Sequence, residues 1–293
     1  MQTRRRFLAI AAATLAAPGA VHAEGWRGTA LGAEAAITLS GPRREVEAAL
    51  AEARATLERM EALFSLHRPD SALSRLNATG RLDAPAPEFM AVIDLCAAAH
   101  AATGGRFDPT VQPLWRALAE QGDVPAAAAR IGWGRVARGA GLRLGPGQAL
   151  TFNGIAQGYA SDRVAEGLAT RGFERALVNI GEMRALGGPW RIGIEDHARG
   201  LLGQATLTGG AIATSSPGAL FLPGGASHIL DPRSGGAVPP AWSSVSVEAD
   251  SAALADALST AFCLMERDEI AALRVAGLRR VRLVDATGDL TTL

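Results

Sequence analysis

The residues with the clearest chemical potential are an aspartate and a threonine four positions apart, Asp256 and Thr260. The apolar pattern of residues 251–264 predicts a helix, and positions i and i+4 of a helix share one face. A carboxylate and a hydroxyl side by side offer the hard oxygen ligands that Mg2+ prefers, with positions left for water or phosphate. An exposed aspartate and a threonine bonded to its own helix would show the same spacing, so both interpretations stay open.

Three further side chains are candidates for a site. His228 could act as a general acid or base, although a lone histidine beside apolar residues is often structural. Asp108 either contacts a ligand or caps the helix that follows Pro109. His67 either stacks on an aromatic ring or is simply exposed. None of these residues decides the function separately.

The stretch 150–187 is the scaffold around which such groups are most readily arranged. Its pattern predicts, in order, a strand at 149–152, a turn at Asn153-Gly154, a helix ending at Gly172, a buried strand at 176–180 and a turn at Gly181-Glu182. Turns of this kind expose backbone groups that can bind phosphate or carry the oxygen ligands of a metal. An ordinary βαβ unit would show the same pattern.

The rest of the chain alternates helices and strands without an internal repeat. We expect helices at 42–64 and 87–102, a short helix within 65–77, strands at 27–39, 190–194 and 243–247, and hairpins at 203–215 and 281–290. Strands from distant parts of the chain then pair around the central unit, with the long helices outside. This arrangement is an α+β fold.

The first 23 residues predict export. Thr3 to Leu8 reads TRRRFL and precedes a short apolar run that ends in small residues, which is typical of a twin-arginine signal. We therefore expect a mature chain from Glu24 in the periplasm. No segment offers the roughly 20 apolar residues that span a bilayer, so stable membrane insertion is not expected.

Charge and cysteine usage narrow the function further. The 293 residues carry 29 basic and 29 acidic side chains, and removal of residues 1–23 takes away three arginines and no acids, which changes the net charge from 0 to −3. A weakly acidic chain argues against a general nucleic-acid binder. Cys96 and Cys263 fall in apolar helices, where burial is the favoured expectation and a disulfide remains open.

Eight short blocks occur along the chain from Gly28 to Phe262. They are GTALG from Gly28, FSLHRPDSALSRLN from Phe64, GGRFDPTVQPLW from Gly104, NGIAQGYASDRV from Asn153, VNIGEMRALG from Val178, AIATSS from Ala211, HILDPRSGG from His228 and ADALSTAF from Ala255. In this order they resemble the FAD:protein FMN transferase family, also called the ApbE family. The resemblance implies an ApbE-like (T-fold-like) α+β fold, with mixed sheets and packed outer helices in one catalytic domain, residues 24–293.

The resemblance also implies a reaction, the Mg2+-dependent transfer of FMN from FAD to a threonine or serine hydroxyl of an acceptor flavoprotein, with AMP leaving. Such a transfer needs a cation beside the pyrophosphate and an acceptor hydroxyl that is held in line and loses its proton. By resemblance, Asp256, Thr260 and the main-chain carbonyl of Gly154 hold the metal, and His228 assists deprotonation. The positions that resemble FAD contacts are Leu31, His67, Arg106, Phe107, Asp108, Thr151, Gln157 and Leu230.

The chain departs from the family pattern at three of these positions: an aromatic residue is common in place of His67, and the other two are polar. It also has Asn153 where the family has glycine or serine, and a shorter turn after Ile180. Thr151 stands where the family usually has an aspartate, and Gln157 where it often has a lysine or glutamate. The loss of charge bears on FAD affinity more than on the metal, whose ligand positions are intact. Together with the export signal, these changes resemble the NosX-type branch, whose acceptor is NosR, a membrane flavoprotein of nitrous oxide respiration.

Two other functions remain compatible with the sequence. A Mg2+-dependent FAD pyrophosphatase would use the same metal and base but would pass FMN to water and release it with AMP. A non-catalytic FAD-binding maturation protein would fit the neutral residues at Thr151 and Gln157.

Overall fold

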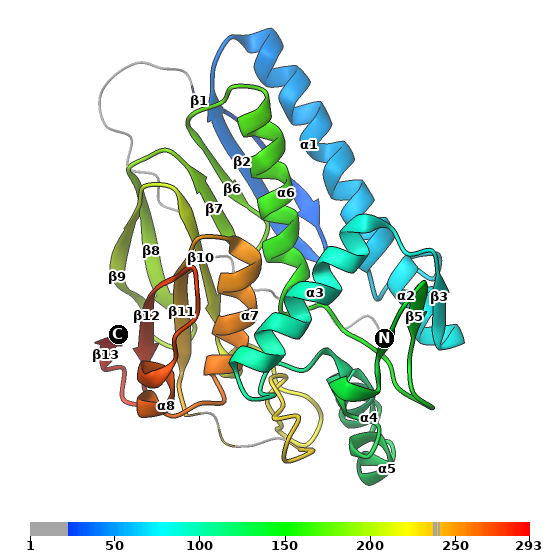
Figure 1. Cartoon of the computed structure of the whole chain (residues 1–293). Coiled ribbons are helices and arrows are strands. Elements are labelled where there is room, and N and C mark those ends of the chain that lie inside the picture. The colour runs from blue at the N-terminus through cyan, green and yellow to red at the C-terminus, as the bar shows by residue number, and fades with distance from the viewer. Residues whose placement is uncertain (1–22, 237–238, 240) are drawn as a thin grey trace.

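The computed structural model describes residues 23–236, 239 and 241–293, so the predicted export signal lies outside the described residues except for Ala23. Its main element is an eight-stranded sheet of order β1-β2-β6-β7-β10-β11-β12-β13 (Figure 1). The strands are β1 (Ala23–Ala30), β2 (Ala33–Ser40), β6 (Ala176–Asn179), β7 (Met183–Leu186), β10 (Gly210–Ser215), β11 (Ser244–Ala249), β12 (Leu278–Val284) and β13 (Leu290–Thr292). Every strand pair in the described residues is antiparallel.

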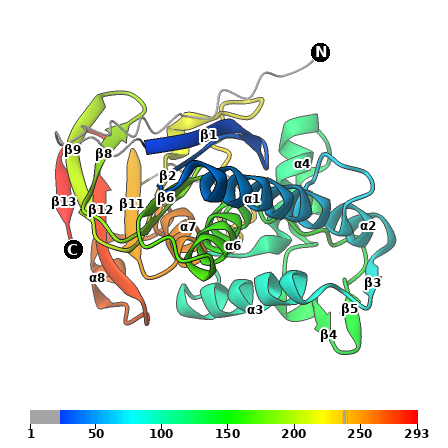
Figure 2. The ribbon, with the colours of Figure 1, turned by 90° about the horizontal axis from the view of Figure 1, so that it is seen from above.

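Helices cover one face of this sheet. Helices α1 (Arg43–Phe64), α6 (Ala156–Thr170) and α7 (Ala252–Phe262) lie along it, and α3 (Pro87–Ala102) packs outside them (Figure 2). Four aromatic rings fill the space between α1, α3 and α6, with centroids 5.4–5.9 Å apart: Phe64, Phe89, Phe152 and Tyr159. Edge-on ring contacts at this distance stabilise a core beyond the area they bury.

The other face of the sheet carries a two-stranded ribbon, β8 (Trp190–Asp196) and β9 (Gly200–Leu207). Alternate residues of the ribbon pack on the large sheet because a strand directs every second side chain to one face. The buried contacts are Trp190, Ile192, Ile194, Ala205 and Leu207 against Leu177, Met183, Ala185 and Ile212. The ribbon covers only part of this face.

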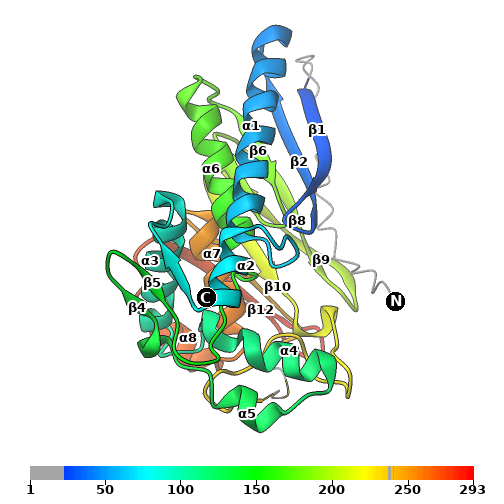
Figure 3. The same cartoon turned by 90° about the vertical axis from the view of Figure 1, so that its right-hand side faces the viewer.

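The remaining elements gather at the end of the molecule opposite the start of α1, where Figure 3 shows α4 and α5. They are α2 (Ala72–Thr79), α4 (Gln112–Glu120), α5 (Val124–Ala128), α8 (Arg267–Ala272), the 3-10 turns η1 (Pro109–Val111), η2 (Trp133–Arg135) and η3 (Pro217–Ala219), and the small sheet of β3 (Arg81–Asp83), β4 (Ala137–Arg138) and β5 (Gly141–Arg143). In the described chain no helix has the length and apolarity needed to cross a membrane.

Helices α6 and α7 approach each other closely because Gly158 has no side chain. A Cβ atom at Gly158 would lie 2.3 Å from the carbonyl oxygen of Ala252. One turn further along α6, Asp162 accepts hydrogen bonds from the N–H groups of Ala252 (2.8 Å) and Ala253 (2.9 Å). These donors belong to the first turn of α7, where N–H groups lack partners within the helix. The two helices are therefore fixed against each other.

The α+β class is confirmed, as are the sheet with outer helices and the single domain, although the antiparallel pairing excludes the mixed sheets that we expected for the described strands. The helices predicted at 42–64 and 87–102 are α1 and α3. Cys96 and Cys263 are both buried and both free, which agrees with the favoured expectation.

Three local predictions are wrong. The single strand expected at 27–39 is the hairpin β1–β2, because Leu31 and Gly32 adopt positive φ angles of 50° and 79° and form a turn. The hairpin expected at 203–215 does not form, since β9 pairs with β8 whereas β10 pairs with β7 and β11. The strand expected at 149–152 does not form, because this segment pairs with no strand of the described chain.

A side chain replaces that missing partner. Asn77 donates from Nδ2 to the carbonyl oxygen of Leu150 (2.8 Å) and accepts from its N–H group (2.7 Å). The next residue, Thr151, donates its N–H to the carbonyl of Pro109 (2.9 Å). The backbone groups of this segment are thus satisfied without a sheet. The central unit is therefore a loop, a helix and a β-hairpin, and the alternative interpretation as an ordinary βαβ unit is excluded.

Candidate active site

One cavity of about 1260 Å3 receives all the residues that the sequence singled out. Its lining includes the predicted metal set Gly154, Asp256 and Thr260, the predicted base His228, and the predicted FAD positions Leu31, His67, Arg106, Phe107, Asp108, Thr151, Gln157 and Leu230. Ligand cavities commonly measure about 300–1,000 Å3, so this one has room for a dinucleotide and a segment of a second substrate. Twelve residues from distant parts of the chain therefore share one space.

The loop before α6 and the face of α7 meet at the floor of this cavity. A Cβ atom at Gly154 would lie 2.8 Å from Thr260 Oγ1, so the loop backbone lies directly against α7. Thr260 Oγ1 also lies 3.3 Å from Ser215 Oγ at the end of β10. Asp256, one turn earlier on α7, accepts a hydrogen bond from the N–H of Gly158 at 3.2 Å. Backbone and side-chain oxygens from two segments are thus collected at one point.

Asp256 is almost completely withdrawn from water, with 3% of its surface exposed. This burial raises the pKa of Asp256 to about 8; the Gly158 hydrogen bond opposes the rise and the charge of Asp162 adds to it. A cation bound beside a buried carboxyl group stabilises its charged form. The exposed-aspartate interpretation of the 256/260 spacing is therefore excluded.

A second buried carboxylate, Glu182, lies in the same cavity and was not selected from the sequence. Its Oε2 accepts from the N–H of Thr214 (3.3 Å), and its backbone carbonyl accepts from Ser161 Oγ (2.8 Å). Burial, and next the charge of Asp256, raise the pKa of Glu182 well above its ordinary value. The available signal was an acidic residue in the glycine turn directly after a continuous apolar strand.

His228 lines the cavity from the loop after η3 and is half-buried. Its Nδ1 lies 3.1 Å from the carbonyl oxygen of Leu220. A carbonyl can only accept, so Nδ1 carries the proton in this contact and Nε2 is the basic nitrogen of the neutral ring. The backbone N–H of His228 bonds the same carbonyl at 3.1 Å, which fixes the position of the residue.

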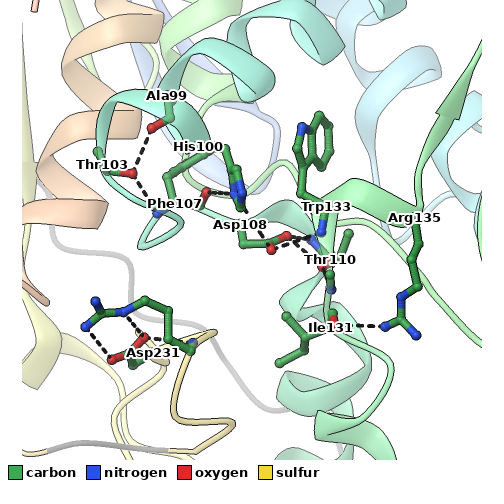
Figure 4. Close-up of polar contacts among 12 residues, drawn as sticks. Ala99, His100, Thr103, Phe107, Asp108, Thr110, Ile131, Trp133, Arg135 and Asp231 are labelled. Atoms are coloured by element: carbon green, nitrogen blue, oxygen red, sulfur yellow. Dashed lines mark hydrogen bonds and ion pairs between the residues drawn. The ribbon is translucent and has the colours of Figure 1, made fainter.

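The segment 106–108 is held by the protein itself. Asp108 caps η1: Oδ1 accepts from the N–H (2.8 Å) and Oγ1 (2.6 Å) of Thr110, and Oδ2 accepts from the N–H of Trp133 (3.3 Å), as Figure 4 shows. Arg106 donates to the carbonyl of Leu264 (3.3 Å) and pairs with Glu269. The capping interpretation of Asp108 is confirmed, and any contact with a ligand comes in addition to it.

The other predicted FAD positions line the same cavity. Leu31, in the β1–β2 turn, donates its N–H to Glu61 Oε1 (2.8 Å) and accepts at its carbonyl from Gln157 Nε2 (3.4 Å). Thr151 Oγ1 accepts from the N–H of Asn153 (3.2 Å), which shapes the loop before α6. His67 is exposed at the rim, whereas Leu230 is buried in the wall; they complete the predicted set.

The donors at the cavity floor fit a hard divalent cation. Carboxylate, hydroxyl and carbonyl oxygens are the ligands of Mg2+, and Gly154, Asp256 and Thr260 supply one of each. Among the described residues, no three His, Cys, Asp or Glu side chains gather in a group that could hold a metal. A cation here would consequently depend on hydroxyl, carbonyl and substrate oxygens as well as on carboxylates.

The antiparallel sheet, the joined helices α6 and α7, and the cavity lined by buried carboxylates are the features of an α+β enzyme. The sequence profile of the ApbE family matches residues 31–281. The chain belongs to the ApbE family, and the family resemblance of the eight blocks is confirmed.

Curated relatives and solved structures agree with this assignment. A protein of Klebsiella pneumoniae named FAD:protein FMN transferase is 30% identical over 201 residues, which are 61% of this chain and 63% of that protein. A protein of the same name from Treponema pallidum is 28% identical over 286 residues, 84% of this chain and 78% of that one. The flavinyl transferase ApbE of Pseudomonas stutzeri superposes with a TM-score of 0.80 at 28% identity, covering 93% and 95% of the two chains.

Proposed function

We propose that this protein transfers FMN from FAD to a threonine or serine hydroxyl of an acceptor protein. The observation that carries the proposal is the convergence of all twelve predicted residues on one cavity in a chain of the ApbE family. Curated relatives are named for this reaction. The neutral residues Thr151 and Gln157 still line the cavity, which favours a protein that has kept its substrate site over one that has lost it.

The bond changes follow from the reaction. The acceptor oxygen attacks the phosphorus on the flavin side of the FAD pyrophosphate, the bridging P–O bond breaks, and AMP leaves with its electron pair. A Mg2+ ion held by Asp256, Thr260 and the carbonyl of Gly154 would neutralise charge on the pyrophosphate. No arginine forms an ion pair with Asp256 in the described chain, so this carboxylate is available for that role.

His228 would receive the proton of the acceptor hydroxyl at Nε2. The contact of Nδ1 with Leu220 sets the tautomer that leaves Nε2 basic and orients the ring. Arg106, which the resemblance places at an FAD contact, also bonds Leu264 and Glu269, and these bonds would hold its side chain in the cavity wall. Positioning and charge neutralisation then supply most of the rate enhancement.

The acceptor and the compartment are finer parts of the same proposal. The arginine-rich start at Thr3 to Leu8 supports export to the periplasm by the twin-arginine route. The departures at Thr151 and Gln157 support the NosX-type branch, with a NosR-like membrane flavoprotein as acceptor. Both proposals extend the transferase assignment without being required by it.

The decisive experiment incubates the purified protein with FAD, Mg2+ and the periplasmic flavin-binding region of NosR, and measures the intact mass of the acceptor. We expect a gain of one FMN less one water, and we expect Asp256→Asn or excess chelator to abolish it. Asp94→Asn, a change of the same kind at a side chain that is 71% exposed, serves as the matched control and should retain full activity.

Other outcomes identify the competing functions. Free FMN and AMP with an unmodified acceptor would indicate the FAD pyrophosphatase. Intact FAD that remains bound, with no turnover by wild type, would indicate the maturation protein. Transfer that persists in excess chelator would contradict the assignment of Asp256, Thr260 and Gly154 to a cation.

A further inference from the structure

Most buried carboxylates in the described part of the chain are paired with a basic side chain. Seven acidic residues are buried in the described part of the chain. Five of them have an arginine or histidine nitrogen within 3.8 Å: Asp108, Asp162, Asp196, Asp231 and Glu248. The two exceptions are Asp256 and Glu182, and both line the cavity. A cation bound in the cavity would supply the positive partner that these two carboxyl groups lack and would favour their charged forms.

Helix α6 brings the two exceptions together. The N–H of Gly158 donates to Asp256 Oδ2, and Ser161 Oγ donates to the carbonyl of Glu182. Positions 158 and 161 are three residues apart on the helix, a spacing that places neighbours on one face about 5–6 Å apart. The two acidic residues are therefore attached to adjacent points on the same helix.

Strand β10 links Glu182 to the other side of the site. The Glu182 carboxylate accepts from the N–H of Thr214, and the hydroxyl of the next residue, Ser215, lies 3.3 Å from Thr260 Oγ1. Glu182 and Thr260 thus contact consecutive residues of the same strand end and line the same cavity. Its second oxygen, Oε1, accepts no hydrogen bond from any described residue, and because no fully buried polar side-chain atom in the described chain lacks a partner, this oxygen is open to the cavity.

We propose that Glu182 shares a bound divalent cation with Asp256, so that the site contains two carboxylates rather than the one that the family resemblance supplies. The inference rests on the cation assignment of the proposed function and adds a residue to it. Two negative charges near a divalent ion raise its affinity before FAD arrives. The chain would then hold the cation without waiting for the substrate phosphates.

The test measures binding of Mn2+ alone to the purified protein without FAD, by the electron paramagnetic resonance signal of the free ion. We expect Glu182→Gln to weaken Mn2+ binding at least tenfold and Asp256→Asn to weaken it at least as much. Glu195→Gln is the matched control, because it neutralises a glutamate that lines the same cavity from β8. Its Mn2+ affinity should stay within twofold of that of wild type.

Thermal unfolding in chelator separates this effect from misfolding. Without a cation, Glu182→Gln replaces a buried acid without a basic partner by a neutral side chain of the same size, so its melting temperature should equal or exceed that of wild type. Glu182→Asp keeps the charge on a shorter side chain, and its Mn2+ affinity should lie between those of wild type and Glu182→Gln. A merely structural role of Glu182 predicts a lower melting temperature and an unchanged affinity.

Two results overturn the inference. Mn2+ affinity of Glu182→Gln within twofold of wild type refutes it and leaves the proposed transfer intact. A wild-type protein that binds no Mn2+ refutes it together with the cation assignment. Conversely, Mn2+ binding that depends on Glu182 in a protein that transfers no FMN supports the inference and contradicts the proposed function alone.

Discussion

Replacement of Gly158 by alanine should separate the two helices that carry the cavity floor. The new Cβ would lie 2.3 Å from the carbonyl oxygen of Ala252, 2.5 Å from its carbonyl carbon and 2.7 Å from the nitrogen of Ala253. These are backbone atoms, which cannot rotate away as a side chain would. Ordinary contacts are roughly 1 Å longer, so α6 and α7 must move apart by about that amount.

The magnitude follows from two opposing terms. Overpacking of a tight contact costs about 1–3 kcal/mol, and a clash with backbone belongs at the upper end of that range. Alanine regains about 1 kcal/mol over glycine inside a helix. We therefore expect the free energy of unfolding to fall by about 2 kcal/mol, which lowers the melting temperature of a protein of this size by about 4–8 °C.

Gly167→Ala provides the matched control, because Gly167 lies on the exposed side of the same helix and nothing is within 4 Å of its missing Cβ. This variant should be about 1 kcal/mol more stable than wild type. Urea unfolding followed by far-ultraviolet circular dichroism measures both. If Gly158→Ala proves as stable as wild type, the close contact of α6 and α7 is not as described and the reasoning fails.

Two further predictions concern buried aspartates. Asp162→Asn leaves one oxygen for two N–H donors at the start of α7, so the free energy of unfolding measured in urea should fall by about 2 kcal/mol. The control Asp94→Asn changes an exposed side chain and should alter this free energy little. An unchanged urea midpoint of Asp162→Asn would contradict the capping role. For Asp196, burial favours a higher pKa, but hydrogen bonds from Ser243 and Ala198 outweigh it and the pKa lies below its ordinary value of 3.8. A carboxyl group with a lowered pKa stabilises the fold above its unfolded pKa and loses that contribution as the pH falls, so the melting-temperature difference between wild type and Asp196→Asn should shrink below about pH 4; a difference that widens there would refute the assignment.

The elements that the sequence predicted correctly carry their own local signals. Helix α3 has Pro87 at its first position and ends just before Gly104, and Ser71 and Ser251 cap α2 and α7 through their side chains. Such signals act within a few residues and do not depend on the rest of the fold. Helix ends of this kind can therefore be predicted from the local sequence alone.

The failures share a different cause. The segment 149–152 has the apolar pattern of a strand, but the partner of Leu150 is a side-chain amide 73 residues earlier. The turn at Gly209-Gly210 looks like a hairpin, but β9 and β10 belong to different sheets because β9 packs across the face of the large one. Pairing partners are chosen by tertiary contacts, which local periodicity does not contain.

The sequence predicted which residues line the site, but not which of its carboxyl groups are buried there. The blocks placed Asp256 and Thr260 together, whereas Glu182 resembles an ordinary turn residue until Ser161 and Thr214 are seen to hold it in the cavity. Burial is a property of the assembled fold, and it is burial that gives this carboxylate its significance.

The same contact that builds the floor of the cavity should couple cation binding to stability. Asp256 on α7 bonds the backbone of Gly158 on α6, so the oxygens that would face the ion keep their spacing only while the helices stay packed. A ligand that binds only the packed state stabilises it in proportion to the logarithm of its concentration above its dissociation constant. Gly158→Ala should therefore lose stability and lose most of the Mn2+-induced rise in melting temperature, whereas Gly167→Ala should keep the full rise. Both variants add one methyl group to the same helix, but only the methyl group at position 158 meets α7, so we attribute a difference between them to that contact.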